Sequence, residues 1–191
     1  LRDGSTAILT SSSYATHSGT EYKAIGLLDP GYQDSSKDWI SKDTFPNKVE
    51  WVQLQLTSPR KISQYTLVSS AYGSSYNPAV WALQGSNDGS SWTTLHEQTS
   101  DQSTYFKAKE QVTKSFPITS GTAFSYYRLG FSQAWKVEGT PDASRVELAG
   151  WDLTFDVPMT TPAPGGPIPV VASEASSQWS NTYRPEKAFN G

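Results

Sequence analysis

The sequence predicts an all-β fold, a two-layered sandwich of about eight antiparallel strands, and three observations lead to this prediction. No segment shows helical periodicity over a long stretch. Short runs rich in β-prone residues are separated instead by clusters of Gly, Pro, Ser, Asn and Asp. In the clearest run, residues 49–56, Val52, Leu54 and Leu56 alternate with Gln53 and Gln55. A period of two places one face of a strand in the core and the other toward water.

The next strands are predicted at residues 62–68 and 80–83. Residues 85–91 read Gly-Ser-Asn-Asp-Gly-Ser-Ser, and Asn, Asp and Gly in such a cluster close a tight hairpin because they accept positive φ. The returning strand begins with Trp92, Thr94 and Leu95. Later strands are expected within residues 105–116, 126–131 and 146–155, which are β-prone and too short for free-standing helices.

The chain of 191 residues is long enough for one large domain, or for one ordinary domain with an appendage. Only 36% of its residues are hydrophobic, but 7 Trp, 10 Tyr and 7 Phe supply bulky core material. We expect the sandwich to occupy residues 1–157. Residues 158–169 are rich in Pro, Thr and Gly, and such a composition forms an extended linker that cannot join the interior of a sheet.

The tail after the linker repeats the opening of the chain. Residues 176–189 align without gaps with residues 12–25 at an offset of 164, with identities at both serines and at Lys-Ala. We therefore expect residues 170–191 to be the start of a second, truncated copy of the same module.

Charge and composition argue against several classes of function. Lys plus Arg number 15 and Asp plus Glu 18, without basic runs, so neither a nucleic-acid surface nor a polybasic membrane patch is predicted. No apolar stretch approaches the roughly 18 to 20 residues that cross a bilayer. The absence of Cys excludes disulfides, thiolate zinc sites and Cys nucleophiles.

No catalytic residues are predicted. The two histidines, His17 and His96, lie far apart in the sequence, and there is no Gly-x-Ser-x-Gly, His-Glu-x-x-His or phosphate-binding Gly motif. A choice of two acids among 18 carboxylates carries no information without geometry. We therefore expect a protein that is not an enzyme.

Residues 81–92, Trp-Ala-Leu-Gln-Gly-Ser-Asn-Asp-Gly-Ser-Ser-Trp, resemble the strand, hairpin and following Trp of the discoidin family, the coagulation factor 5/8 type C domains. Within that family the likeness is nearest to the family 32 carbohydrate-binding modules. It covers roughly residues 7–156, and further matching segments follow in the family's order: Lys23-Ala24-Ile25 and residues 51–56, 126–129 and 146–148.

The resemblance implies a jelly-roll, galactose-binding-like β-sandwich that is secreted or on the cell surface. It also implies a non-catalytic carbohydrate-binding or adhesion module within a multi-domain or repeat protein, with glycans or glycoproteins as partners. The alternative is a structural repeat of an extracellular filament, sheath or surface array, in which copies of the module contact one another. Membrane lipid ranks third, because no loop combines exposed Leu or Phe pairs with Lys or Arg clusters.

By resemblance, ligands bind to loops at one end of the sandwich. Aromatic rings stack there on the apolar face of a sugar while polar side chains bond its hydroxyls. Among the aromatic residues of these loops, Trp135 is the stronger candidate for a stacking ring. The competing interpretation is that such aromatic residues pack in the core or pin loops. We assign Trp51, Trp81 and Trp92 to packing or to strand faces, and Arg128 to a structural pair. The candidate ligand-binding residues are His17, Tyr72, Tyr76, Asn77, Trp135 and Arg145.

The resemblance also implies a structural Ca²⁺, an ion that prefers six or more oxygen ligands. Residues 26–31 are longer than the family pattern, and Lys37 stands where a Thr is usual, so its ammonium could replace the ion. Asp side chains in this segment could instead cap turns. Both interpretations stay open. The positional candidates for metal ligands are Ala24, Asp29, Asp34 and Glu147.

Overall fold

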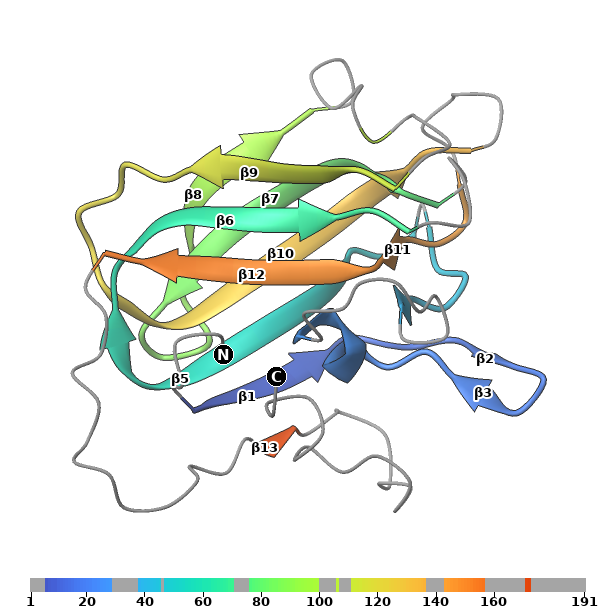
Figure 1. The fold of residues 1–191 in the computed structure, drawn as a ribbon, viewed down its shortest axis with the longest axis horizontal. Helices are drawn as coiled ribbons and strands as arrows, with labels where there is room; N and C mark the ends of the chain where they lie inside the picture. The colour runs from blue at the N-terminus through green and yellow to red at the C-terminus, as the bar shows by residue number, and fades with distance from the viewer. Residues whose placement is uncertain are drawn as a thin grey trace.

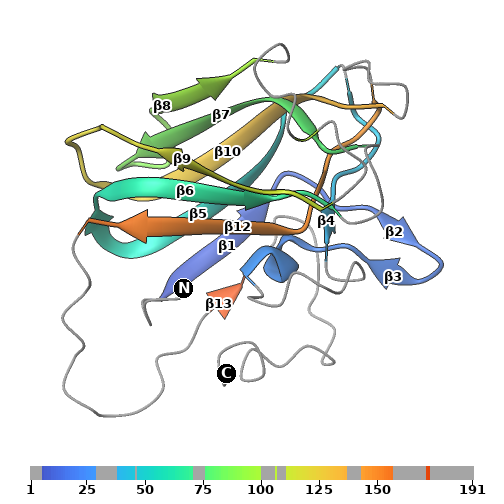
Figure 2. The same ribbon diagram turned by 45° about the horizontal axis from the view of Figure 1, so that its top comes forward.

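The structure is a computed structural model that describes residues 6–28, 38–45, 47–70, 76–99, 106, 111–136, 143–156 and 171–172. Two mainly antiparallel sheets are packed face to face, as Figure 1 shows, and the turned view in Figure 2 separates the two layers. The predicted all-β sandwich is confirmed. Among the described residues, the only helical element of more than one residue is the short 3-10 helix η1, Ala24–Leu28.

The larger sheet has six strands in the order β13-β1-β5-β10-β7-β8. All its neighbours are antiparallel except β1 and β13, which run parallel. Its centre is formed by β5 and β10, two strands of 11 residues each. The strands are β1 (Ala7–Ser11), β5 (Glu50–Arg60), β7 (Pro78–Ser86), β8 (Thr93–Gln98), β10 (Phe124–Ala134) and β13 (Val171–Ala172).

The smaller sheet has three strands in the order β12-β6-β9. Two further ladders of two residues per strand join β4 to β11 and β2 to β3. Figure 1 shows both short ladders at the same end of the sandwich. The bounds are β2 (Thr16–His17), β3 (Thr20–Glu21), β4 (Trp39–Ile40), β6 (Ile62–Val68), β9 (Thr113–Pro117), β11 (Glu147–Leu148) and β12 (Gly150–Phe155).

The core lies between the two sheets, and the period of two read from the sequence decides which side chains enter it. In β5, Val52, Leu54 and Leu56 are buried while the intervening glutamines are half-exposed, as predicted. Across the ladder, Leu54 pairs with Tyr127 and Val52 with Leu129, and these partners are also buried. Burying each such side chain contributes about 1.5 to 3 kcal/mol relative to leaving it in water. The largest buried side chains include Trp39, Trp81, Trp151, Tyr65 and Phe131.

The predicted Asn-Asp-Gly hairpin joins β7 to β8 and is confirmed. The Asp88 carboxylate accepts the backbone N–H groups of Ser90 at 2.8 Å and Ser91 at 2.7 Å. Gly89 follows at φ 72°, a conformation that a residue without Cβ adopts freely. The side-chain oxygen of Asn87 accepts the backbone N–H of Ser125 at 2.9 Å, which ties the turn to the start of β10. The turn is thus held by its own side chains.

The strands β5, β7 and β10 extend beyond the expected residues 49–56, 80–83 and 126–131. Two further expected strands differ more. Within residues 105–116 the described strand begins only at Thr113, and Phe106 is a buried core residue. The expected strand at residues 146–155 is divided into β11 and β12 because the chain changes partners there. The N–H of Ala149, between the two strands, donates to the carbonyl of Val68 at 2.9 Å. Residues before this point pair with β4, and residues after it pair with β6.

The predicted linker, residues 158–169, lies outside the described residues. Of the expected second copy the structure describes only β13, which lies beside β1 (Figure 1). Within the described parts of the chain, no helix has the length and apolar character needed to cross a bilayer.

Candidate functional site

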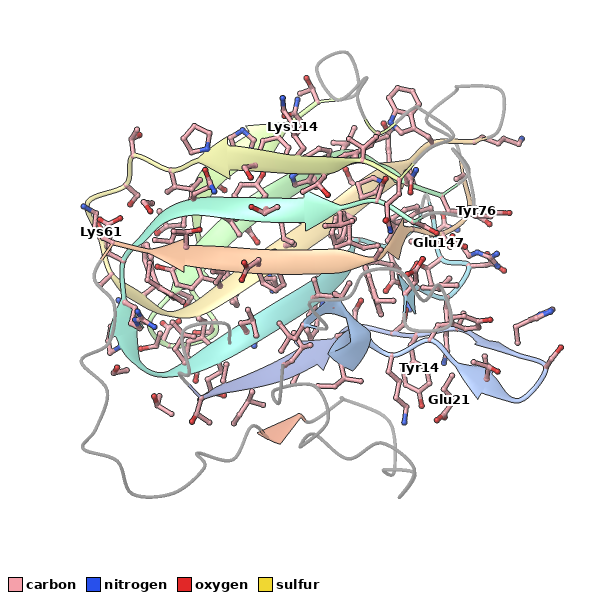
Figure 3. All side chains as sticks on the ribbon, in the orientation of Figure 1. Tyr14, Glu21, Lys61, Tyr76, Lys114 and Glu147 are labelled. Carbon is pink, nitrogen blue, oxygen red and sulfur yellow. The ribbon has the colours of Figure 1, made fainter. Side chains whose placement is uncertain are left out.

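At one end of the sandwich three distant parts of the chain are bound together by backbone hydrogen bonds. The N–H of Tyr76 donates to the carbonyl of Trp135 at 2.6 Å, and the N–H of Trp135 donates to the carbonyl of Asn77 at 2.8 Å. The N–H of Glu147 donates to the carbonyl of Tyr76 at 2.7 Å. The start of β7, the end of β10 and β11 therefore form one rigid platform, and Figure 3 shows Tyr76 and Glu147 at that end.

Tyr76 is held in an uncommon backbone conformation at this platform. Its φ is 72°, a region that non-Gly residues enter rarely and usually at a cost of about 1 to 3 kcal/mol. The Arg145 guanidinium lies over its ring, 4.3 Å from the ring centroid. Such a stack is a cation–π contact, and it fixes the ring and the guanidinium relative to each other.

Arg145 also faces two carboxylates. Its Nη2 is 3.6 Å from Oε1 of Glu147, and its Nη1 is 3.9 Å from Oδ1 of Asp43. The Asp43 oxygen accepts the hydroxyl of Ser144 at 2.8 Å. The Nε of Arg145 is buried and has no hydrogen-bond partner among the residues that the structure describes. We call Tyr76, Arg145, Glu147, Asp43 and Ser144 the rim cluster.

Glu147 is the buried acid of the rim cluster. Burial raises the pKa of its carboxyl to about 7, and the neighbouring Arg145 guanidinium opposes that rise while the Asp38 carboxylate adds to it. The protonated form of Glu147 is therefore more accessible than that of a carboxyl group in water. It can accept a hydrogen bond in one state and donate one in the other.

Two of the sequence-predicted ligand residues are buried instead of exposed. Trp135 was expected to present its ring to a sugar, but only 4% of its surface is accessible, because the backbone bonds on both sides of it turn the ring into the core. Asn77 is fully buried, and its Oδ1 accepts the N–H of Ser70 at 3.1 Å. The backbones of both residues hold the platform together, and their side chains offer almost no accessible surface in this structure.

The other predicted ligand residues differ in placement. Tyr76 and Arg145 contact each other and are half-buried. His17 is exposed in the β2–β3 hairpin, whose turn contains Ser18 at φ 50° and Gly19 at φ 82°. That hairpin projects from the same end of the sandwich as β4 and β11 (Figure 1). Tyr72 lies outside the described residues.

The candidate metal ligands are described only in part. Ala24 begins η1 and is buried, and Glu147 is in β11, while Asp29 and Asp34 lie outside the described residues. Within the described ranges no group of three or more His, Cys, Asp or Glu side chains is placed to hold a metal ion. Asp38, just before β4, is a buried acid whose charge acts on Glu147. These two carboxylates are the hard oxygen donors that Ca²⁺ prefers.

Asp38, Asp43 and Ser144 were not predicted from the sequence. Asp43 and Ser144 are 101 residues apart and meet because the N–H groups of Thr44 and Phe45 both donate to the Ser144 carbonyl, at 3.0 and 2.9 Å. No local sequence pattern predicts such a long-range contact. For Asp38, the one available signal was its position directly before Trp39.

The assignments of Trp81 and Arg128 agree with the structure. Trp81 is buried, and its Nε1 donates to the Tyr65 hydroxyl at 2.9 Å. Arg128 donates from Nη2 to Oε1 of Gln84 at 2.9 Å, and its guanidinium lies 3.8 Å from the ring centroid of Trp92. Arg128 is thus the predicted structural pair, on the outer face of the large sheet.

Comparisons with known proteins agree with this architecture. The family model of the F5/8 type C domain matches residues 8–148, more than half of the chain. A comparison with curated protein sequences finds no match.

Similar solved structures include the module CpGH89CBM32-5 from Clostridium perfringens, in complex with GalNAc-β-1,3-galactose, at 17% identity and a TM-score of 0.58; the match covers 80% of this chain and 96% of that one. The family 32 module of NanJ from C. perfringens, in complex with galactose, has 15% identity and a TM-score of 0.56, covering 80% and 94%. The family 32 module of EndoD from Streptococcus pneumoniae has 16% identity and a TM-score of 0.55, covering 77% and 94%. At these identities the likeness establishes the fold.

Proposed function

The chain belongs to the F5/8 type C domain family, and from that premise we propose that it is a non-catalytic module that binds glycans at the rim cluster. The proposal extends to an extracellular setting, on a cell surface or in a secreted multi-domain protein. Glycan-bound relatives with the same fold support the ligand class, because galactose-containing sugars occupy two of the structures similar to this one.

The observation that carries the proposal is the Arg145 guanidinium, fixed between an aromatic ring and two carboxylates. Sugars need hydrogen-bond donors and acceptors at close spacing, since an unpaired buried hydroxyl is costly. Arg145 supplies donors, Asp43 and Glu147 supply acceptors, and the Ser144 hydroxyl can do either. The Tyr76 ring offers a nearby apolar surface.

A rim of this kind supports only weak binding at one site. With one half-buried ring and few polar groups, we expect a Kd of about 0.1 to 1 mM, or about −4 to −5.5 kcal/mol. Repeated modules compensate for weak single sites, because a second linked site acts at a raised effective concentration.

The test is a titration of the intact chain with galactose and N-acetylgalactosamine, followed by NMR or calorimetry. Arg145→Lys keeps the charge but loses the planar fork of donors, and we expect its affinity to fall at least fivefold. Arg128→Lys is the matched control, because Arg128 is also stacked on an aromatic ring but lies on the face of the large sheet. Absence of binding at about ten times the expected Kd, or equal losses in both variants, would refute the proposal.

We also propose a structural Ca²⁺ beside Glu147. Two buried carboxylates, Asp38 and Glu147, support it, and the family resemblance adds the oxygen atoms of Ala24, Asp29 and Asp34. The rival cation is the Arg145 guanidinium, already 3.6 Å from Glu147. If the ion binds, 5 mM Ca²⁺ should raise Tm by several degrees and Mg²⁺ should not, since Mg²⁺ demands a tighter octahedral shell. No difference between calcium and a chelator would exclude the ion.

The second candidate function is a structural repeat that acts through contacts between modules. The observation that favours it is the strand β13, which follows the linker and pairs with β1. Analytical ultracentrifugation over a wide range of concentration tests self-association. A monodisperse monomer at the highest concentration would count against an array built from separate chains.

A further inference from the structure

At one edge of the large sheet, β1 is covered by β13, a segment that follows the sandwich in the sequence. β1 pairs with β5 on one side, and β13 lies on its other side. Edge strands expose unpaired N–H and C=O groups, which makes them templates for another strand. What occupies this edge therefore decides what the module can dock with.

The direction of each backbone group in β1 follows from its ladder with β5. In an antiparallel ladder every second residue turns its N–H and C=O toward the partner. The N–H of Ser12 donates to the carbonyl of Trp51 at 2.9 Å, so Ile8, two pairs of residues earlier, also faces β5. Ala7 and Leu9 face the open edge instead.

The register of β13 matches these directions. Ile8 is paired with Val171 and Leu9 with Ala172 in a parallel ladder. In such a ladder one member of each pair bonds to the two residues that flank its partner. Since the backbone of Ile8 is committed to β5, Val171 is the member that faces β1, between Ala7 and Leu9. Ala172 consequently turns its backbone groups away from β1.

The repeat in the sequence shows which residues of the first copy correspond to β13. At the offset of 164 residues, Val171 corresponds to Ala7 and Ala172 to Ile8. In the first copy Ala7 faces the open edge and Ile8 faces β5. In the tail Val171 faces β1 and Ala172 faces away. Val171 and Ala7 therefore direct their backbone groups to the same edge of their strands. The opposite edge of the tail strand, which would pair with the β5 strand of a second copy, stays free.

A register shift of one residue is the geometric condition for this arrangement. In a parallel ladder only one residue of each pair turns its backbone groups toward the partner strand. If two copies of the same strand met through the same edge in equal register, both residues of a pair would turn toward the partner or both would turn away. The two strands must be displaced by an odd number of residues. The observed pairing of Ile8 with Val171, the counterpart of Ala7, satisfies that condition.

We propose that the open edge of β1 is a docking edge for the first strand of a following module, occupied in this chain by Val171–Ala172. Two successive modules then share one continuous sheet through their β1 strands. The inference is independent of sugar binding, since it involves only backbone groups at the edge of the large sheet.

The test is amide hydrogen exchange of the 191-residue chain, followed by NMR at Leu9 and Ile8. The Leu9 amide should be protected by β13 and the Ile8 amide by β5. In this register the Leu9 N–H faces the Val171 carbonyl and the Val171 N–H faces the Ala7 carbonyl. Val171→Pro removes the second bond and so loosens this two-pair ladder, and exchange of Leu9 should accelerate at least tenfold while Ile8 is unchanged. Ala172→Pro is the matched control, because its N–H faces away from β1 and its loss should leave Leu9 protected.

Each other outcome overturns the proposal. Rapid exchange of Leu9 in the unsubstituted chain, or no acceleration in Val171→Pro, means that β13 does not cover the edge. Equal acceleration by both prolines contradicts the register. Protection of Leu9 that disappears on dilution identifies a strand from a second chain as the occupant. All of these readouts are unaffected by whether the rim cluster binds a sugar.

Discussion

At the scale of single residues, a chain of hydrogen bonds inside the sandwich ends at one histidine. The Nε1–H of Trp81 donates to the Tyr65 hydroxyl at 2.9 Å, and that hydroxyl lies 2.7 Å from Nδ1 of His96. The hydroxyl proton can therefore be donated to Nδ1, which requires a neutral imidazole. Burial lowers the pKa of His96 and favours the same form.

This arrangement predicts a loss of stability in mild acid. Because the pKa of His96 is lower in the folded state than in the unfolded state, its contribution is complete above about pH 6.5 and declines as the pH falls. The free energy of unfolding, measured with urea at pH 7 and pH 5, should drop less in His96→Leu than in the unsubstituted chain. His17→Gln, at the exposed histidine, should leave the difference unchanged. The same drop in all three proteins would contradict the assignment.

Tyr127 gives a second prediction at this scale. Its buried hydroxyl donates to the carbonyl of Arg60 at 2.5 Å, and burial raises the pKa of the phenol to about 12. Tyr127→Phe leaves that buried carbonyl without this donor and should cost about 1 to 2 kcal/mol in denaturant unfolding. Tyr126→Phe, at the half-exposed neighbour, should change the free energy of unfolding by less than about 0.5 kcal/mol. A larger effect at Tyr126 than at Tyr127 would show the hydroxyl to be unimportant.

At the scale of elements, the contact between β7 and β10 depends on a glycine. A Cβ at Gly85 would lie 2.4 Å from Cδ2 of Phe124, in the space that the aromatic ring fills. Gly85→Ala should therefore destabilise the sandwich by about 1 to 3 kcal/mol, because the ring cannot move without disturbing the core. Gly121→Ala is the control, since nothing lies within 4 Å of its Cβ. A thermal melt distinguishes the two, and a neutral Gly85→Ala would show that Phe124 moves easily.

Elements that depend on local pattern were predictable from the sequence, and those that depend on tertiary pairing were not. The strand β5 and the turn at Asp88 follow from alternation and from side-chain chemistry within a few residues. The strands β4 and β11 contain two residues each, too few to show a period. Of the rim cluster, Tyr76 and Arg145 were candidates for ligand binding and Glu147 was a candidate for metal binding. Asp43 and Ser144 were not predicted, because they meet through long-range backbone bonds.

Burial of Trp135 has the same origin. In the sequence it stands among polar neighbours, which favours an exposed loop. In the structure its backbone continues the bonding beyond the end of β10, with Asn77 and Tyr76 as partners. The direction of a side chain at the end of a strand is set by such pairing, and neighbouring residues in the sequence carry no record of it.

At the scale of the whole molecule, each sheet joins strands that are far apart in the chain. Leu54 pairs with Leu9 on one side and with Tyr127 on the other, and Val68 pairs with Gly150. Sandwiches dominated by such pairings fold in milliseconds to seconds. We expect refolding from urea, followed by tryptophan fluorescence in a stopped-flow instrument, to fall in that range. Folding within about 100 microseconds would contradict the role of non-local pairing.

β12 is the last strand of the sandwich in the sequence, and this order has a consequence during protein synthesis. The small sheet receives its last strand only when Phe155 has left the ribosome, so the apolar inner faces of the earlier strands wait for it uncovered. A nascent module in that state is vulnerable to aggregation and is a natural client for chaperones.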